Sequence, residues 1–151
     1  MRCSSNRVGI RSVILQIDTR LRVPIRKYGC YYMSLLFLVN KYTNTALSVT
    51  RINNSIYMGA IQQGHMGQNC YMTDPTGFCK WLGWDARYTG SHVPVSYVCQ
   101  QNEAEILRFQ HPKFGSHFVV GDGNGWVAYD PYGESLSVAE GVLKDKRIFR
   151  F

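Results

Sequence analysis

Three residues of the sequence, Cys30, His117 and Asp130, have side chains that together can carry out acyl transfer. A cysteine thiolate is a strong nucleophile, an imidazole can take and return its proton, and a carboxylate can hold the imidazole in one tautomer. The cysteine lies early in the chain, whereas the histidine and the aspartate lie close together near its end. Two separate structural elements must therefore bring the three side chains together.

The histidine and the aspartate belong to a predicted β-hairpin, GSHFVVGDGNGWVAYDPYG, at residues 115–133. Two apolar runs flank the sequence DGNG, which is typical of a tight turn because Gly and Asn tolerate positive φ. With Gly123-Asn124 as the loop, His117 faces Asp130; with the loop one residue later, His117 faces Tyr132 and Asp130 lies diagonally on the same face. Only an odd-length loop or a bulge separates the pair. Exposed His–Asp pairs are also ordinary on hairpins, so the hairpin alone does not indicate catalysis.

The cysteine opens the segment CYYMSLLFLVNKY, which follows Gly29. This segment is apolar almost all round and contains no Gly or Pro, so it predicts a helix that is buried on most faces. A helix N-terminus carries about half a positive charge, which favours the thiolate form of Cys30. A free cysteine is more often a packing residue, and the catalytic interpretation therefore depends on the helix and on the chain order.

The pattern along the chain predicts an α+β fold with N-terminal helices packed on an antiparallel β-sheet. Capped helical patterns occupy SVTRINNSIYMGAIQQG and TDPTGFCKWLGW, and short β-branched or aromatic segments follow Gly90. Residues 13–21 form either a strand or a short helix, and Val23-Pro24-Ile25 is expected to be extended or turning. The expected strands are VPVSYV, EILRFQ, SHFVVG, WVAYD and RIFRF.

Composition places the chain among folded globular proteins of one domain. It has 151 residues, of which 45% are hydrophobic and 18% charged. No apolar run approaches the ~20 residues of a membrane helix, and the N-terminus lacks a signal-peptide pattern, so we expect a cytoplasmic protein without a membrane span. The five cysteines are odd in number and include no C-x-x-C, which predicts reduced thiols, no metal and no cofactor.

The formal net charge of +7 is concentrated at the start of the chain. We expect residues 1–22 to form a basic segment and residues 23–151 to form the domain. Such a segment suits an acidic protein, an anionic wall polymer or nucleic acid as a partner. A solvated basic face is the simpler explanation, and no nucleic-acid-binding motif supports the nucleic-acid alternative. The cations among the first 27 residues are Arg2, Arg7, Arg11, Arg20, Arg22, Arg26 and Lys27.

The sequence YGCYYMSLLFLV followed by GSHFVVGDGNGWVAYDPYG resembles the papain-like cysteine peptidases, and among them the C39-like branch. In that branch a Cys opens the first helix, a His begins a strand, and an Asp lies in a D-P-Y/F-G element after the next strand. The chain is also similar to phage- or plasmid-borne families of unknown function within this superfamily. The resemblance implies the papain-like fold, with Cys30 as nucleophile, His117 as general base and Asp130 as the orienting acid.

One departure from the family pattern concerns the oxyanion hole. Active relatives usually carry a Gln about six residues before the Cys as an oxyanion donor, and here Pro24 takes that position and has no N–H to donate. The nearby candidates are Arg26 and Lys27, and Gln62, Gln63 or Gln68 from the following segment. The candidates for lining a substrate cleft are Tyr31, Trp126 and Tyr132.

Two functions follow from these patterns. The first is a cysteine peptidase or amidase that cleaves a peptide or isopeptide bond through an acyl-enzyme. The second is a catalytically inactive papain-like domain that binds a protein or nucleic acid, which the missing Gln and the net charge of +7 favour.

Overall fold

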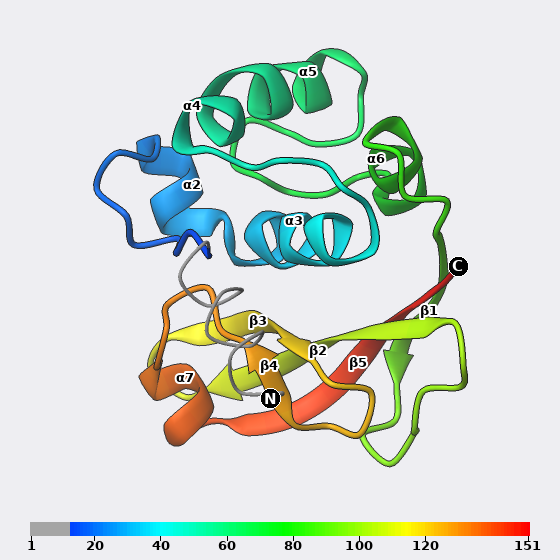
Figure 1. Cartoon of the computed structure of the whole chain (residues 1–151). Helices are drawn as coiled ribbons and strands as arrows, with labels where there is room; N and C mark the ends of the chain where they lie inside the picture. The colour runs from blue at the N-terminus through cyan, green and yellow to red at the C-terminus, as the bar shows by residue number, and fades with distance from the viewer. Residues whose placement is uncertain (1–12) are drawn as a thin grey trace, which may run out of the picture.

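The computed structural model describes residues 13–151, which form a layer of helices and a layer of antiparallel sheet (Figure 1). The expected α+β class is confirmed. No helix among these residues is long and apolar enough to cross a bilayer. The helices are α2 (Val23–Tyr28), α3 (Cys30–Tyr42), α4 (Val49–Arg51), the π-helix η1 (Ile52–Ile56), α5 (Tyr57–Gln62), α6 (Pro75–Trp81) and α7 (Leu136–Ala139).

The sheet has five strands in the order β1-β5-β2-β3-β4, so the last strand of the chain lies between the first and the second. Each neighbouring pair is antiparallel. Four of the five expected strand segments lie mostly within observed strands. The strands are β1 (Arg87–Val93), β2 (Glu103–His111), β3 (Gly115–Gly121), β4 (Val127–Tyr129) and β5 (Val142–Arg150).

The expected strand VPVSYV is wrong. Strand β1 ends at Val93, and the chain then turns, with the Tyr97 N–H donating to the Pro94 carbonyl at 3.0 Å. The Tyr97 carbonyl accepts a hydrogen bond from the Lys146 side chain, with Nζ at 2.6 Å, and not from the backbone of a neighbouring strand. Proline lacks the N–H that a ladder needs, so the β-branched residues around Pro94 do not continue the strand.

Helix α3 has the predicted start and the predicted burial. Its first residue is Cys30, and most of its side chains are buried in the core between the two layers. Two polar side chains of α3 fix its position: Tyr32 donates to the Ile52 carbonyl at 2.8 Å, and Ser34 donates to the Phe118 carbonyl of β3 at 3.3 Å. The helix is therefore tied both to the helical layer and to the strand that carries His117.

The segment before α3 differs from its expected form. Val23-Pro24-Ile25 is the first turn of α2 rather than extended chain, because a proline in a first helical turn has no N–H to leave unpaired. Residues 13–22 form turns without regular helix or strand. Of the expected helices, that over SVTRINNSIYMGAIQQG is confirmed, with a π-helical stretch inside it, and Asp74 caps α6 by accepting from the Gly77 N–H.

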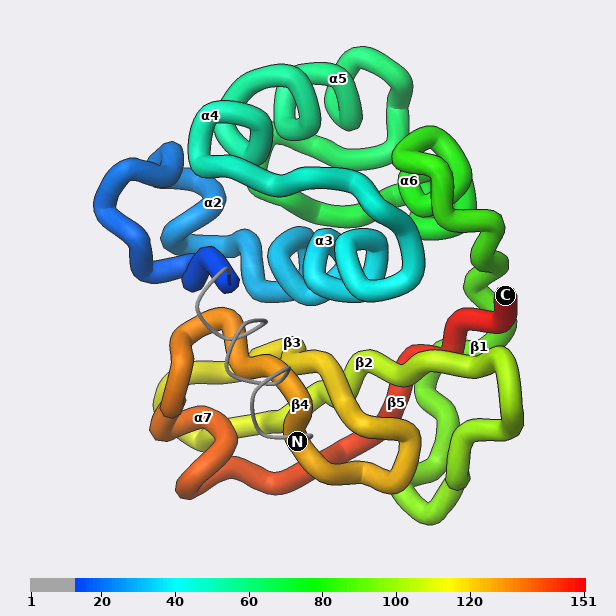
Figure 2. Tube along the Cα trace, viewed as in Figure 1, coloured from blue at the N-terminus to red at the C-terminus, as the bar shows by residue number. Residues whose placement is uncertain are grey.

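The described part of the basic N-terminal segment packs against the domain (Figure 2). The Gln16 N–H donates to the Pro131 carbonyl at 2.8 Å, and the Tyr129 hydroxyl donates to the Ile14 carbonyl at 2.8 Å. Gln16 and Leu21 are buried. Residues 14–16 thus lie beside the end of β4 and the loop that follows it, and Arg20 and Arg22 are hydrogen-bonded to Asn53 of η1. Residues 1–12, with three of the basic side chains, lie outside the described residues.

A fully buried ion pair joins the central strands to the β3–β4 turn. Glu105 of β2 and Lys146 of β5 meet at 2.9 Å, with side-chain exposures of 0% and 1%. The other oxygen of Glu105 accepts the N–H groups of Gly123 and Gly125 at 3.0 and 2.9 Å. A charge taken out of water must be compensated by its partners, and here each partner belongs to a different segment.

We expect the substitution Lys146→Met to lower the free energy of unfolding by about 3 kcal/mol, because it leaves the Glu105 carboxylate buried without a counter-ion. Urea unfolding followed by circular dichroism measures the change. The matched control is Lys144→Met on the same strand, where the side chain is exposed. Equal losses in the two variants would contradict the proposed weight of the buried pair.

Candidate active site

The position of Cys30 is set by a tight corner between α2 and α3. Gly29 forms this corner, and its N–H donates to the Ile25 carbonyl at 2.8 Å. A Cβ atom on Gly29 would collide with that carbonyl, so a side chain cannot be accommodated there. Cys30 follows as the first residue of the 13-residue helix α3, with a partly exposed side chain. The thiol therefore lies at the N-terminus of α3.

The hairpin that carries the other two residues contains two irregularities that cancel. Its turn closes with the Asp122 N–H donating to the Trp126 carbonyl at 2.9 Å, so the loop is residues 123–125 and the expected two-residue loop is wrong. A bulge then follows at Val120, where the register shifts by one residue. A single odd-length loop would have put His117 and Asp130 on opposite faces, whereas the loop and the bulge together return them to the same face.

The structure brings His117 and Asp130 into direct contact. The Nε2 atom of His117 lies 2.8 Å from Oδ1 of Asp130, and both side chains are 4% exposed. Asp130 also accepts the Tyr132 N–H at 2.9 Å, the Ser135 N–H at 3.1 Å and the Ser135 hydroxyl at 2.7 Å. Burial by itself would raise the pKa of Asp130, but these hydrogen bonds, with that of His117 the largest, lower it. The carboxylate is thereby held ionised in the protein interior.

The pKa of His117 is raised to about 9. Burial acts against the charged imidazole, and the hydrogen bonds and charges of Asp130 and Cys30 outweigh it. Since Nε2 is taken by Asp130, Nδ1 is the ring nitrogen that remains for the Cys30 thiol. The Tyr132 ring stacks on the imidazole at a centroid distance of 4.8 Å and helps to keep it in this plane. With this pKa the imidazole is in its charged form near neutral pH.

A cleft of about 590 Å³ opens at Cys30. One wall comes from the helical layer and the loop before α6, and the other comes from β1, β3 and β5. Aromatic rings dominate both walls, as expected for a binding site that must exclude water from part of its ligand. The lining residues include Tyr28, Tyr31, Asn69, Tyr71, Tyr88 and Phe118.

The three expected cleft residues have different positions. Tyr31 lines the cleft, and its ring contacts the Phe118 ring edge-on at 5.0 Å. Tyr132 is not a lining residue and stacks on His117 instead. Trp126 lies at the hairpin turn with 74% of its surface exposed and does not line the cleft. The expected face is also wrong, because Trp126 pairs with Asp122 and Val127 pairs with Gly121, which puts Val127 rather than Trp126 on the face of His117.

None of the expected oxyanion donors is among the described residues that line the cleft. The Arg26 Nε–H donates to the Leu21 carbonyl at 3.1 Å, which ties this side chain to the residues before its own helix. Lys27 is exposed at the end of α2, and Gln62 is exposed at the end of α5. Arg26 and Lys27 are close to Cys30 in sequence, but of α2 only its last residue, Tyr28, is among the described residues that line the cleft.

Two polar residues near the site carry no distinctive sequence signal. Asn69 lines the cleft, and its Oδ1 accepts the Tyr71 N–H at 3.3 Å, which leaves the amide N–H groups free. Ser135 binds Asp130 through both its backbone and its hydroxyl. Each lies in a loop, where Asn and Ser are common, so only the tertiary structure distinguishes them.

Within residues 13–151 no group of three or more His, Cys, Asp and Glu side chains is arranged to hold a metal ion. The four described cysteines, Cys30, Cys70, Cys79 and Cys99, are free thiols.

The chain matches the model of a family described as "Protein of unknown function, DUF261" over residues 13–151. The chain belongs to the DUF261 family. No curated protein and no solved structure gives a significant match. The matched region of this DUF261 chain includes Cys30, His117 and Asp130. It also includes the N-terminal residues that pack beside the Asp130 loop.

In the DUF261 chain we expect Asp130→Asn to lower the pKa of His117 from about 9 toward its ordinary value of 6.5. The reason is that the charge and the hydrogen bond of the Asp130 carboxylate, which raise this pKa against the effect of burial, are then lost. The raised pKa of wild-type His117 contributes stability that is complete below pH 6.5 and is lost as the pH rises through about 9. The variant should lose this pH dependence. NMR titration of the imidazole protons measures the pKa, with Asp85→Asn, an exposed carboxylate, as the control. An unchanged His117 pKa in Asp130→Asn would refute the assignment.

Proposed function

We propose that this DUF261 chain is a papain-like cysteine hydrolase of the C39-like kind, which cleaves a peptide or isopeptide bond. The observation that carries the proposal is the buried 2.8 Å contact of His117 with Asp130, together with the influence of the Cys30 thiol on the same imidazole. A nucleophile that lines an aromatic cleft, a base whose pKa that nucleophile raises, and a carboxylate hydrogen-bonded to the base form the arrangement that acyl transfer needs.

The reaction follows from the roles of these groups. The Cys30 sulfur attacks the substrate carbonyl while its proton is held by His117, and the imidazolium then gives that proton to the leaving amine. The C–N bond breaks and a thioester remains on Cys30. A water molecule attacks the thioester, His117 takes its proton and returns it to the sulfur, and the carboxylic acid product leaves. Asp130 orients the imidazole throughout and keeps its own charge.

The negative charge on the carbonyl oxygen needs donors in the tetrahedral state. The backbone N–H of Cys30 belongs to the first turn of α3, where helix geometry supplies no partner. Asn69 lines the same cleft from the loop before α6, and its amide N–H groups form no hydrogen bond with the described residues. We propose that these two groups form the oxyanion hole, in place of the Gln that Pro24 replaces.

A binding module without catalysis is the second candidate. It is favoured by the absence of Arg26, Lys27 and Gln62 from the cleft, and by the net charge of +7, which suits an acidic protein or nucleic acid. The two candidates differ in the reactivity of one sulfur atom, so a chemical probe separates them.

We expect a peptidyl vinyl sulfone to label one cysteine of the full chain much faster than the others, and Cys30→Ala to abolish that labelling. His117→Ala should slow it by about 10²-fold or more, because the proton acceptor is lost. Mass spectrometry of the labelled protein gives the rate at each cysteine. Cys99→Ala removes another partly exposed thiol and serves as the control. If Cys30 reacts no faster than the other cysteines, the binding module becomes the better account.

We expect Asn69→Ala to slow acylation by a p-nitrophenyl ester by roughly 10²-fold without a comparable change in KM, because the lost interaction forms only in the transition state. Pre-steady-state release of p-nitrophenol measures this step. Gln68→Ala changes the adjacent exposed amide and is the matched control. Equal acylation rates for Asn69→Ala and the wild type would mean that backbone N–H groups alone hold the oxyanion.

A further inference from the structure

The cleft that begins at Cys30 has an uneven charge. None of its described lining residues is Asp or Glu, and Arg147 is the one that carries a fixed charge. His92 lies on the same wall and adds positive charge when it is protonated. The remaining lining side chains are aromatic, apolar or neutral and polar. A ligand in this cleft therefore meets a single cationic group in mostly apolar surroundings, where a charge interaction is stronger than in water.

The guanidinium of Arg147 is held firmly on the sheet wall. Its Nη1 donates to Asp145 at 2.5 Å, and its Cζ lies 5.4 Å from the centre of the Phe118 ring. Its side chain is 12% exposed. An arginine fixed by a carboxylate on one side and an aromatic ring on another loses little freedom when it binds a ligand.

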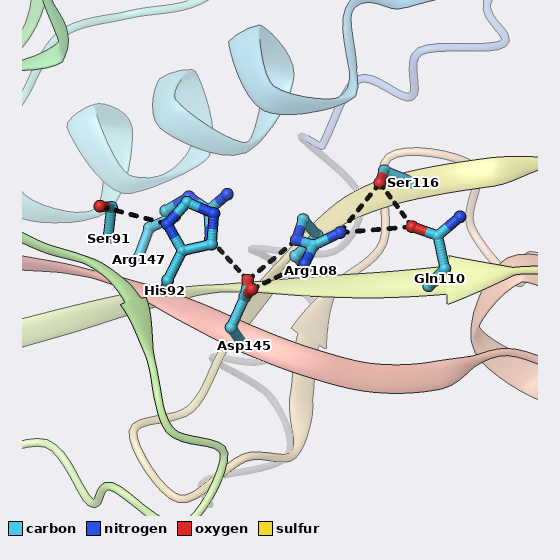
Figure 3. Close-up of polar contacts among 7 residues, drawn as sticks. All are labelled: Ser91, His92, Arg108, Gln110, Ser116, Asp145 and Arg147. Carbon is cyan, nitrogen blue, oxygen red and sulfur yellow. Dashed lines mark hydrogen bonds and ion pairs between the residues drawn. The ribbon is translucent and has the colours of Figure 1, made fainter.

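The carboxylate that holds Arg147 does not neutralise it, because Arg108 shares the same group (Figure 3). Arg108 donates to both oxygens of Asp145 at 2.9 and 2.7 Å, and its Nη1 contacts Gln110 and Ser116. Two guanidinium groups against one carboxylate leave a net charge of +1. Among the described residues, Arg147 is hydrogen-bonded through Nη1 alone, and it lines the cleft.

We propose that the cleft selects peptides that carry a carboxylate, and that Arg147 is the specificity-determining residue that binds it. This proposal rests on the hydrolase function proposed above and names its class of substrate. A guanidinium binds a carboxylate through paired N–H groups, and an apolar cleft without acidic side chains favours an anionic partner over a cationic one.

The distance along the cleft indicates where the carboxylate lies in the substrate. Tyr31 is the residue after Cys30, and the centre of its ring lies 5.0 Å from the centre of the Phe118 ring. The centre of the Phe118 ring lies 5.4 Å from Cζ of Arg147. An extended peptide advances ~3.3 Å per residue. The carboxylate is therefore a few residues away from the bond that Cys30 attacks. An Asp or Glu side chain and a free C-terminus have the same chemistry at that distance.

The test uses peptidyl vinyl sulfones in matched pairs, Glu against Gln and Asp against Asn, at each of the four residues nearest the reactive group. We expect the full wild-type chain to be labelled at Cys30 about ten- to a hundredfold faster by the acidic member at one position. The substitution Arg147→Gln should remove that preference, and Arg147→Lys should retain part of it. Lys144→Gln makes the same charge change on an exposed site of β5 and should leave the preference intact.

The two sources of the carboxylate are separated by a second set of peptides. These peptides are non-reactive and end either in a free carboxylate or in an amide, and their binding to the Cys30→Ala chain is measured by calorimetry. Preference for the free terminus identifies a C-terminal substrate, and preference for Asp or Glu at an internal position identifies an acidic side chain. Either result supports the proposal if Arg147→Gln abolishes it.

The failure of this inference differs from the failure of the proposed function. Rapid Cys30 labelling with equal rates for acidic and neutral peptides would overturn the role of Arg147 and leave the hydrolase intact. Slow labelling at Cys30, together with Arg147-dependent binding of acidic peptides to the Cys30→Ala chain, would overturn the hydrolase and support the carboxylate site. If Arg147→Gln unfolds, equal binding of acidic and neutral peptides by folded Arg147→Lys and wild type would overturn the inference.

Discussion

The rest of the site depends on the hydrogen bonds of one buried group, the carboxylate of Asp130. It lies in the loop after β4, and it accepts hydrogen bonds from His117, Tyr132 and Ser135. Because each donor belongs to a different part of the strand or loop, one charged group fixes both the imidazole and the chain that returns toward α7. A buried charge with this many donors is favourable only when all of them are present, so the loop and the imidazole are ordered together.

A second buried charge supports the first from the other end of the hairpin. Glu105, paired with Lys146, binds the N–H groups of the β3–β4 turn. That turn has an odd-length loop whose effect on side-chain direction is reversed by the bulge at Val120. If the loop were one residue shorter or longer, the side chains of β4 and of the loop after it would point to the opposite faces of the sheet. The Glu105–Lys146 pair thus stabilises the register that lets Asp130 reach His117.

The nucleophile and the base come from different layers, and their approach depends on how α3 lies over β3. Ser34 of α3 donates to the Phe118 carbonyl, one residue after His117, and Tyr31 packs against the Phe118 ring. These contacts hold the first turn of α3 over the start of β3. The same Phe118 ring supports Arg147 farther along the cleft. The reactive end and the charged end of the cleft therefore share one aromatic side chain, which couples substrate position to the position of the sulfur.

The sequence by itself determined the features that depend on local pattern. It predicted α3 from Cys30 onward and the β3–β4 hairpin, because periodicity and turn residues act over short distances. The contact of His117 with Asp130 was expected from a two-residue loop, whereas the structure makes it through a three-residue loop and a bulge. Tertiary structure alone decided which residues line the cleft. Asn69 and Arg147 reach it from a loop and from the last strand, while Arg26 and Lys27, close to Cys30 in sequence, do not. The insertion of β5 between β1 and β2 brings Arg147 there, and strand order is set by the burial of whole surfaces, which no short stretch of sequence contains.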